Sequence, residues 1–270
     1  MHIDLLGPLV AHRGGVSFVP TAVKPKKVLA LLALNANRFV QLQAIENELW
    51  GTTPPKSALT TIQTYIMQIR KRMDAALDGD GPRAKDVLIT GTTGYQLRIL
   101  PPDLDLARYQ DLIARGELAL TSGKYDRAAC LFADALAVWR DDALVDVRHG
   151  PAIETEVREL DASRTLTLER RIEAELRLGQ HYGVLTELAV LTRRHPFNEN
   201  LHGQFMRALY RSGRRAEALS LYRRVRERFI GELGIDPSPR LRELHQIVLN
   251  CDDCRGEVFS PSTPDVKSAC

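Results

Sequence analysis

The chain has 270 residues, of which 44% are hydrophobic and 26% are charged, as in ordinary globular proteins. This length predicts two domains, each able to bury its own core. The longest apolar run, Val28–Leu34, is too short to cross a membrane, and the first residues lack the basic start and cleavage site of a signal peptide. These features argue against a membrane or secreted protein and predict a cytoplasmic one.

The net charge of +3 is unevenly distributed. Residues 1–100 contain twelve Lys or Arg and seven Asp or Glu, a net +5, so the other 170 residues carry −2. No acidic residue occurs from Leu49 to Met73. A surface that binds the phosphate backbone offers cations and lacks carboxylates. An ordinary solvated basic helix has the same charge, so charge alone leaves both interpretations open.

The first predicted elements are short strands at His2–Gly7 and Val16–Val19, separated by a turn at Arg13–Gly15. A helix follows, for which Lys24-Pro25 is a suitable start, because proline in the first turn loses no hydrogen bond. Asn35 and Asn37 are its expected stops.

The second predicted helix spans Gln41–Trp50, where apolar residues recur at three- and four-residue spacing. Gly51 and Pro54-Pro55 end it, since glycine favours a helix C-terminus and proline cannot continue a helix.

The third predicted helix, Ser57–Leu77, is the most informative segment. Ser57 is expected to cap its free amides. One apolar stripe runs along it, formed by Leu59, Ile62, Ile66, Ile69, Met73 and Leu77. The opposite face carries Thr60, Thr64, Met67, Gln68 and Lys71, with Arg70 and Arg72 on the two flanks.

That polar face has hydroxyls, amides and cations but no carboxylate. Threonine and glutamine side chains can reach base edges, and flanking Arg and Lys can neutralise phosphates. An ordinary surface helix more often mixes Glu with Lys. The composition of this face therefore favours a DNA-recognition helix.

Two further strands, Val87–Thr90 and Tyr95–Ile99, follow a break at Asp78–Pro82. Gly91–Gly94 joins them as the tip of a hairpin. Three helices followed by such a hairpin predict a winged helix, whose third helix enters the major groove while the hairpin touches the flanking backbone.

Beyond a predicted linker at Pro101-Pro102, Leu104–Asn250 is expected to be almost continuous helix. Gly123, Gly179 and Gly213 are each followed by apolar residues five, nine and twelve positions later. The last two glycines are 34 residues apart, the tetratricopeptide period, whereas the first two are 56 apart, which indicates an insertion around residues 140–161. A plain helical bundle is the alternative to stacked repeats.

The segments Lys24–Leu34, Glu48–Gly51, Pro54–Ala58, Thr61–Met73 and Thr90–Leu97 resemble the response-regulator-type winged helix and, more narrowly, the Streptomyces antibiotic regulatory protein family. The resemblance implies DNA contacts by Thr60, Thr61, Gln63, Thr64, Met67, Gln68, Arg70 and Lys71, with Arg72 beside them. It also implies a wing contact by Thr92 and Thr93, although the family often has Arg there. The loop that faces RNA polymerase in this class matches Thr52, Thr53, Pro54, Pro55 and Lys56.

The second half resembles the bacterial transcriptional activator domain over about Asp103–Leu249. The matching segments are Ala133–Leu144, Arg194–Leu201, Leu209–Arg226 and Glu232–His245. The resemblance implies a role in dimerisation or in supporting the DNA-binding domain, and no catalytic activity goes with it.

Other functions find less support. The sequence has no GxSxG, P-loop or HExxH motif, so we expect neither an enzyme nor a cofactor or metal site. The winged helix begins at residue 2, where a phosphorelay regulator would have a receiver domain first, so we do not expect phosphorelay chemistry. Cys251 and Cys254 could form half of a zinc site, but no second pair follows, and reduced thiols in a disordered tail at 251–270 are the simpler interpretation. The main alternative that does not involve DNA is an interaction scaffold, in which the repeat domain binds a peptide or a regulatory partner.

The sequence thus predicts a mainly α protein: a winged helix-turn-helix (α+β) at 1–100, an all-α tetratricopeptide-like domain at 103–250 and a tail at 251–270. The expected function is a pathway-specific activator of an antibiotic gene cluster. It is expected to bind promoter direct repeats as a homodimer at the nucleoid and to recruit RNA polymerase.

Overall fold

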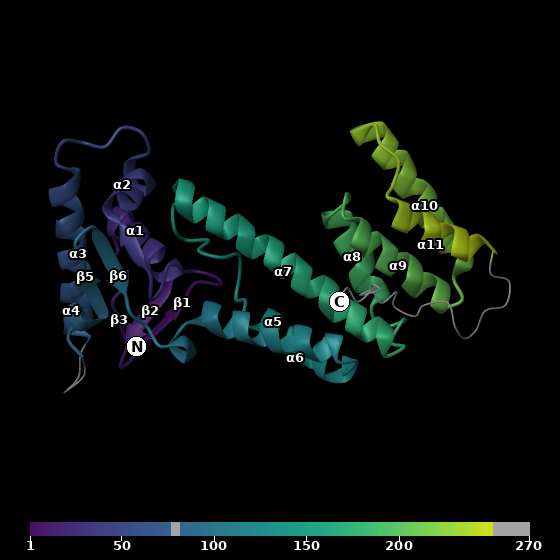
Figure 1. Cartoon of the computed structure of the whole chain (residues 1–270), viewed down its shortest axis with the longest axis horizontal. Helices are drawn as coiled ribbons and strands as arrows, with labels where there is room; N and C mark the ends of the chain where they lie inside the picture. The colour runs from purple at the N-terminus through teal and green to yellow at the C-terminus, as the bar shows by residue number, and fades with distance from the viewer. Residues whose placement is uncertain (77–81, 251–270) are drawn as a thin grey trace, which may run out of the picture. The chain divides into compact units, whose positions relative to one another are not determined.

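The computed structural model of the chain describes residues 1–76 and 82–250 (Figure 1). The chain divides into two compact units, Met1–Ala174 and Glu175–Cys270, each of which is described by itself. The predicted tail at 251–270, with Cys251 and Cys254, lies outside the described residues, as does Leu77. Among the described residues, no helix is long and apolar enough to cross a membrane.

The first sheet is antiparallel in the order β1-β2-β3, and its strands are β1 (His2–Asp4), β2 (Val10–Arg13) and β3 (Val16–Ser17). Gly14 and Gly15 have φ angles of 54° and 81°, which the tight turn between β2 and β3 requires. The predicted turn and the two outer strands are therefore present, whereas β2 was not predicted.

Three helices follow: α1 (Val23–Leu34), α2 (Leu42–Trp50) and α3 (Ala58–Ala75). Pro25 lies in the first turn of α1, where its missing N–H breaks no helical bond. Asn35 caps the other end, and Asn37 has a left-handed φ of 66° that turns the chain out of the helix. Both predicted stops are confirmed.

The second sheet is antiparallel in the order β4-β6-β5, formed by β4 (Phe39–Gln41), β5 (Leu88–Thr90) and β6 (Gly94–Leu97). A short helix, α4 (Ala84–Val87), precedes β5. Gly94 permits the close approach of β6 to β4, because a Cβ there would lie 2.0 Å from the carbonyl oxygen of Val40. The β5–β6 hairpin is the predicted wing, so the predicted winged helix is confirmed, while β4 and α4 were not predicted.

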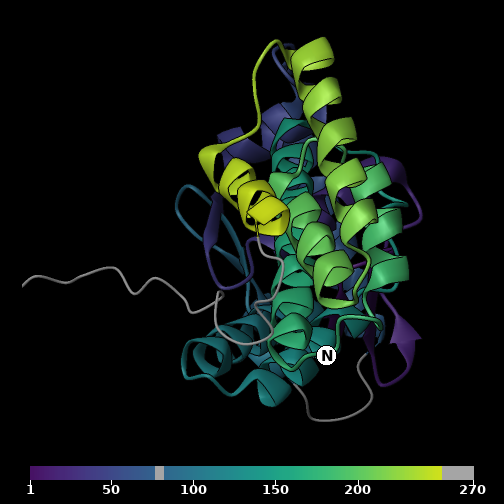
Figure 2. The same cartoon turned by 90° about the vertical axis from the view of Figure 1, so that its right-hand side faces the viewer.

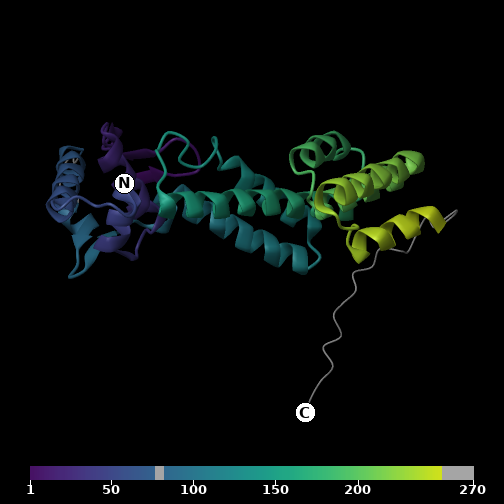
Figure 3. The same ribbon diagram turned by 90° about the horizontal axis from the view of Figure 1, so that it is seen from above.

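The first unit continues through η1 (Pro101–Asp103), α5 (Asp105–Thr121) and α6 (Tyr125–Ala137) into the long α7 (Pro151–Arg177), in which the unit ends. Helices α5 and α6 lie side by side (Figures 1 and 3). Gly116 makes this closeness possible, because a Cβ there would lie 2.7 Å from the ring of the fully buried Phe132.

The second unit contains α8 (Leu185–Arg194), α9 (Glu199–Arg211), α10 (Arg215–Arg228), η2 (Phe229–Leu233) and α11 (Pro239–Asn250). Helix α9 is central, since it contacts α8, α10 and α11 (Figure 2). Met206 and Leu209 of α9 and Leu241 and Leu244 of α11 are buried.

Each of the three repeat glycines ends a helix in the same way. Gly123, Gly179 and Gly213 have φ angles of 71°, 78° and 77°. The amide after each glycine donates to the carbonyl five residues earlier, as Lys124 does to Ala119 at 2.9 Å. This is the Schellman motif, which satisfies the last free carbonyls of a helix. The repeat positions predicted to form the core are all buried: Ala128, Phe132, Ala135, Val184, Leu188, Leu191, Ala218, Tyr222 and Val225.

Residues 138–150 interrupt the predicted run of helix and contain no helix of their own. They pack instead on the start of the chain. The Arg140 amide donates to the carbonyl of Leu6 at 2.8 Å, and the Leu144 amide donates to the carbonyls of Leu5 and Gly7 at 3.0 and 2.8 Å. The insertion that the repeat spacing indicates is thus a segment that returns to the first sheet.

Asp105, at the start of α5, is also hydrogen-bonded to the segment that follows β1. Its buried carboxylate accepts the backbone amides of Leu5 and Leu6, each at 2.8 Å, and that of Leu106 at 2.7 Å. Burial raises the pKa of this carboxyl, and the three amides oppose that rise. Residues 101–104 are therefore held against the first sheet and do not form an open linker. The sequence predicts a domain boundary near residue 101, whereas the boundary between the two compact units falls inside α7, after Ala174.

Glu48, on α2, caps the N-terminus of α7. Its carboxylate has no exposed surface and accepts the amides of Gly150, Ala152 and Ile153 at 2.6, 2.8 and 3.2 Å. Lys27 lies beside it, with its ammonium nitrogen 3.8 Å from Oε1 and donating to the Glu48 carbonyl at 3.1 Å. Free amides at a helix start need acceptors, and negative charge is favourable there.

Replacing Glu48 by Gln should destabilise the first unit. One carboxylate oxygen would become an NH2 group, which donates and therefore cannot accept the backbone amides at the start of α7. We expect a loss of about 3 kcal/mol in unfolding free energy, or roughly 6–12 °C in melting temperature. Thermal unfolding followed by circular dichroism measures this. Glu46→Gln on the same helix is the matched control and should change little. Equal melting temperatures for the two variants would contradict the cap.

Asp146 gives a pH-dependent contact within the inserted segment. It accepts the Leu9 amide at 2.7 Å and binds the Lys26 ammonium at 2.5 Å. Burial raises its pKa, but the hydrogen bonds from Lys26 and Leu9 outweigh burial and lower the pKa below the usual value. The folded state therefore favours the ionised form. This contribution to stability is complete above the ordinary pKa of Asp and is lost as the pH falls through the lowered value.

The difference in melting temperature between the wild type and Asp146→Asn should consequently be largest near neutral pH and shrink in acid. A series of thermal melts from about pH 7 to about pH 3 tests this. Asp134→Asn, at an exposed position on α6, is the control. A difference that grows toward acid would reverse the sign and refute the assignment.

Candidate nucleic-acid interface

Helix α3 is fixed in the winged helix by its inner face. Ile62, Ile66, Ile69 and Met73 of the predicted stripe are buried, at 1% exposure or less. Leu59 is 46% exposed, so its prediction as a core residue was wrong. Ala58 takes the inward position instead, four residues before Ile62, because the helix begins there.

The outer face of α3 carries the predicted contact residues. Six of them are exposed: Thr60, Gln63, Met67, Gln68, Lys71 and Arg72. Thr61 and Thr64 are half-buried, and their hydroxyls donate to the carbonyls of Ser57 and Thr60, both at 2.9 Å. These two hydroxyls therefore offer a ligand mainly their acceptor lone pairs. Ser57 makes no side-chain capping bond, contrary to prediction.

Met67 is the most exposed large apolar residue on this helix, at 64%. It lies among polar neighbours, where it gains nothing from the protein core. An apolar side chain in this position can contact the methyl group of thymine in the major groove. The acid-free stretch from Leu49 to Met73 covers the whole outer face. The first acid after it is Asp74, near the end of α3, which accepts the Ala84 amide at 2.8 Å.

Arg70 lies differently from the other predicted contact residues. Its guanidinium donates to the Leu88 carbonyl through Nε at 3.0 Å and Nη2 at 2.5 Å, and Nη2 donates to the Thr90 hydroxyl at 2.8 Å. Burial lowers its pKa, and Asp74 and Tyr95 oppose this. The side chain thus joins α3 to β5 at the base of the wing. This contact connects two candidate DNA-binding elements, and the sequence-based assignment of Arg70 to phosphate missed it.

The wing tip is a tight turn in which the Gly91 amide donates to the Gly94 carbonyl at 2.8 Å. Thr92 and Thr93, which the resemblance predicts to contact the DNA backbone, are exposed at its end. The Thr93 carbonyl accepts the Leu42 amide at 2.9 Å, so the start of α2 holds the tip. Hydroxyls at this tip can hydrogen-bond to phosphate without contributing charge.

The loop between α2 and α3 presents the residues predicted to face polymerase. Thr52, Thr53, Pro54, Pro55 and Lys56 are all exposed. Gly51 begins the loop with a φ of 62°. Trp50, just before it, has the Lys24 ammonium 4.8 Å from its ring centre. The loop therefore projects from a helix end that is held by packing.

Among the described residues, no group of three or more His, Cys, Asp or Glu side chains could hold a metal ion. The candidate interface presents hydroxyls, amides, cations and one thioether, groups that can hydrogen-bond to a ligand or contact it. It contains no nucleophile paired with a base.

Comparisons with known proteins agree with this architecture. Residues 19–97 match the family described as transcriptional regulatory protein, C terminal, and residues 104–249 match the bacterial transcriptional activator domain. The chain is 48% identical over 254 residues to Regulatory protein DnrI of Streptomyces peucetius, with 93% of each chain covered. The chain belongs to the Streptomyces antibiotic regulatory protein family. The names of other relatives, Transcriptional regulatory protein EmbR of Mycobacterium tuberculosis and Transcriptional regulator RedD of Streptomyces coelicolor, describe transcriptional regulators.

Longer family members contain the same pair of modules within larger chains. The chain is 36% identical over all its length to Regulatory protein AfsR of Streptomyces coelicolor, but spans only 26% of that protein. A structure of Mycobacterium tuberculosis EmbR in complex with a low-affinity phosphopeptide superposes with a TM-score of 0.86 at 34% identity, covering 92% of this chain and 64% of the other. The winged helix followed by a helical domain is thus the fold of this family.

Replacing Arg70 by Ala should loosen the wing. Losing the charged donors to Leu88 and Thr90 should cost about 1–3 kcal/mol, or roughly 2–12 °C in melting temperature. DNA affinity should also fall, while the slope of affinity against salt concentration stays unchanged. Arg72→Ala is the control for stability, because the one hydrogen bond that Arg72 makes within residues 1–76 and 82–250, to the Val19 carbonyl, is long at 3.4 Å. If Arg70→Ala keeps the wild-type melting temperature and reduces the salt slope by about one, Arg70 contacts phosphate instead.

Proposed function

We propose that the chain is a sequence-specific transcription activator that switches on a specialised-metabolite gene cluster. The observation that carries the proposal is the outer face of α3, which is exposed, acid-free and anchored by a buried isoleucine stripe. The names of the relatives, Regulatory protein DnrI and Transcriptional regulator RedD, agree with regulation of transcription. The place of action that follows is promoter DNA in the cytoplasm.

In this proposal α3 lies in the major groove. Gln63, Gln68 and Met67 face base edges, where an amide can pair with adenine and a thioether can contact thymine. Lys71 and Arg72 neutralise phosphates beside the groove. Thr92 and Thr93 of the wing contact the adjacent backbone through hydroxyl and amide groups. Thr60, Thr61 and Thr64 line the N-terminal half of the same face.

Two molecules bound to tandem direct repeats would lie head to tail on one side of the duplex. Repeats spaced by about one helical turn, 10–10.5 base pairs, place both on the same face of DNA. The exposed loop from Thr52 to Lys56 precedes α3 and contains none of the side chains assigned to the groove. We propose that this loop contacts RNA polymerase.

The test is binding of the purified chain to promoters of its neighbouring gene cluster, across a salt series and with scrambled competitor DNA. Tight binding that resists competitor and weakens steeply with salt supports the activator. Binding no tighter than to scrambled DNA refutes sequence-specific recognition by the chain on its own and favours an interaction scaffold.

Two substitutions on α3 separate affinity from specificity. Lys71→Ala should weaken binding to all sequences and reduce the salt slope by about one, since it removes one phosphate contact. Gln68→Ala should change the preferred base at one position, by about 1–3 kcal/mol of discrimination. Site selection from a random library measures the second effect, and Lys124→Ala, at an exposed position before α6, is the control for the first. An unchanged selected site for Gln68→Ala would place that side chain outside the groove.

A further inference from the structure

The charge of the second unit is that of a surface for anions. Residues 175–250 contain thirteen arginines, no lysine and eight Asp or Glu, a net +5, whereas residues 101–174 carry −5. The positive balance of residues 1–100 therefore returns in the second unit and is absent from the residues between. Arginine has a planar fork of donors that matches two oxygens of a phosphate or a carboxylate, which a lysine ammonium does not.

Two of the arginines on α10 stabilise the second unit itself. The guanidinium of Arg215 donates to the carbonyls of Val248 and Leu249 at 2.9 and 2.7 Å, and so satisfies acceptors near the end of α11. Arg228 lies 3.4 Å from the carboxylate of Glu232, one turn later in the chain. These two side chains have structural partners and do not require a ligand.

Three further arginines surround a stacked aromatic pair where α10 and α11 meet (Figure 2). The rings of Tyr222 on α10 and His245 on α11 have their centroids 3.9 Å apart and their planes at 11°. Burial lowers the pKa of His245, and Arg223 lowers it further. Burial raises the pKa of Tyr222, and Arg226 and Arg242 oppose that rise. Cations from both helices therefore act on the same pair of rings.

We call Arg223, Arg226 and Arg242 the arginine face, and all three residues are exposed. Within residues 1–76 and 82–250, Arg223 and Arg242 make no ion pair with a carboxylate, and Arg223 donates to the Ser220 hydroxyl at a long 3.3 Å. Arg226 binds Asp236 at 2.9 Å, but both side chains are about half exposed. A pair so exposed contributes little to stability, so Arg226 can exchange Asp236 for another anion.

Three guanidinium groups around one aromatic pair repel one another, and the carboxylate of Asp236 offsets only part of this repulsion. An anion that carries several charges relieves it. The backbone of a nucleic acid presents such charges at short, regular intervals, and its oxygens accept from the guanidinium fork. Arg223 and Arg226 are one helical turn apart, and Arg242 comes from the neighbouring helix. The three side chains can therefore contact neighbouring phosphates along one strand.

We propose that the arginine face binds the phosphate backbone of duplex DNA and does so without reading its sequence. The inference rests on the proposed function in one respect, because promoter DNA is the polyanion that this function brings to the chain. Recognition by α3 raises the effective concentration of the duplex for a second contact, so weak backbone contacts increase the overall affinity. Guanidinium contacts to phosphate carry no sequence information. The arginine face therefore adds affinity, whereas α3 provides specificity.

The test is a salt series of binding by the full chain to promoter DNA and to a scrambled duplex of the same length, about 40 base pairs or roughly four helical turns. The double variant Arg223→Ala/Arg242→Ala should weaken binding to both duplexes at least about fivefold at about 0.1 M salt and reduce the salt slope by about two. Arg223→Lys/Arg242→Lys, which keeps both charges, should restore most of the slope. The base preference found by site selection should stay that of the wild type.

Two single variants make the test specific to this face. Asp236→Asn removes the carboxylate that competes for Arg226, so it should bind both duplexes about twofold more tightly. Arg228→Ala is the matched control, because it removes the same charge from the other side of α10. It should change the salt slope by less than about one half. All these positions are exposed, so the melting temperatures should match that of the wild type.

The proposal is overturned if the double alanine variant binds the scrambled duplex with the affinity and salt slope of the wild type, or if Arg228→Ala reduces the slope as much. It is equally overturned if the double variant loses binding to polyglutamate but keeps binding to the duplex, since the face then takes an acidic protein. Failure of the proposed function gives a different result. The wild type would bind promoter DNA no more tightly than the scrambled duplex, while the double variant would still bind both more weakly.

Discussion

The buried carboxylate of Glu48 is the contact on which the arrangement of the first unit depends. It belongs to the second helix of the winged helix, yet its acceptors satisfy the free amides at the start of α7, about a hundred residues later. Removing this carboxylate leaves the buried Lys27 charge without its counter-charge and the three backbone amides without acceptors. This is far costlier than losing a surface contact. Lys27 balances the charge; burial lowers the pKa of this ammonium and Glu48 opposes that. Asp105 makes the reciprocal connection, from α5 to the amides of the first sheet.

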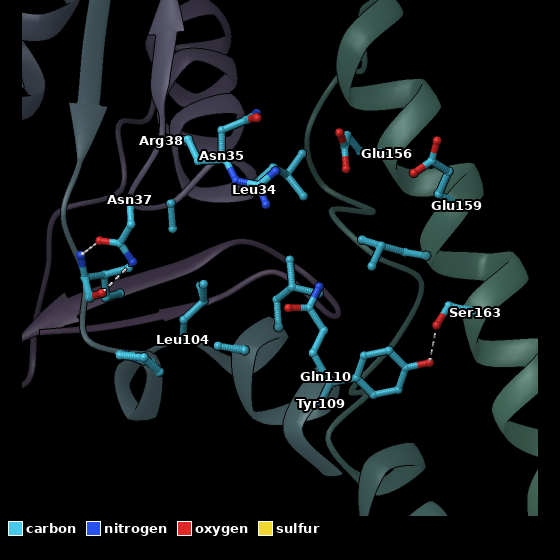
Figure 4. Close-up of a pocket in the computed structure, with 16 residues that line it drawn as sticks. Leu34, Asn35, Asn37, Arg38, Leu104, Tyr109, Gln110, Glu156, Glu159 and Ser163 are labelled. Atoms are coloured by element: carbon cyan, nitrogen blue, oxygen red, sulfur yellow. Dashed lines mark hydrogen bonds between the residues drawn. The ribbon is translucent and has the colours of Figure 1, made fainter. Parts of the chain in front are cut away.

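The carboxylates of Glu48 and Asp105 join the winged helix to α5 and α7, so that the winged helix, α5 and α6 belong to one compact unit. Helix α1 packs on α3, and the end of α1 forms one wall of a cavity of about 430 Å³ whose other walls come from α5 and α7 (Figure 4). Any ligand or partner that acts on α5 or α7 therefore acts on a surface joined to α3 by packed elements. Arg70 extends this continuity to the wing, since it ties the wing strand to α3. A flexible linker between the winged helix and the helices that follow it would not provide this continuous packing.

The sequence predicted those features that depend on local pattern. The periodicity of Ile62, Ile66 and Ile69 identified the buried face of α3, and the repeat glycines identified helix ends that need a left-handed residue. It did not predict β2 or β4, because strands of three or four residues owe their existence to partners elsewhere in the chain. Nor could it predict what Glu48, Asp105 or Arg70 bind. A charged residue has the same appearance in a sequence whether it is solvated or buried against distant amides.

The irregular repeat spacing has its explanation in the same contacts. Gly179 and Gly213 are 34 residues apart, but Gly123 and Gly179 are 56 apart. The additional chain includes residues 138–150, which leave the helical path, and Asp146 and Gly150 within them meet Leu9 and Glu48. Gly150 allows this because a Cβ there would lie 2.3 Å from the Glu48 carbonyl oxygen. A repeat that only stacked on its neighbours would need no such segment. The departure from the 34-residue period therefore marks where the helical repeats are fitted to the winged helix, and a similar interruption in related chains should contain the residues that bind the equivalent of Glu48.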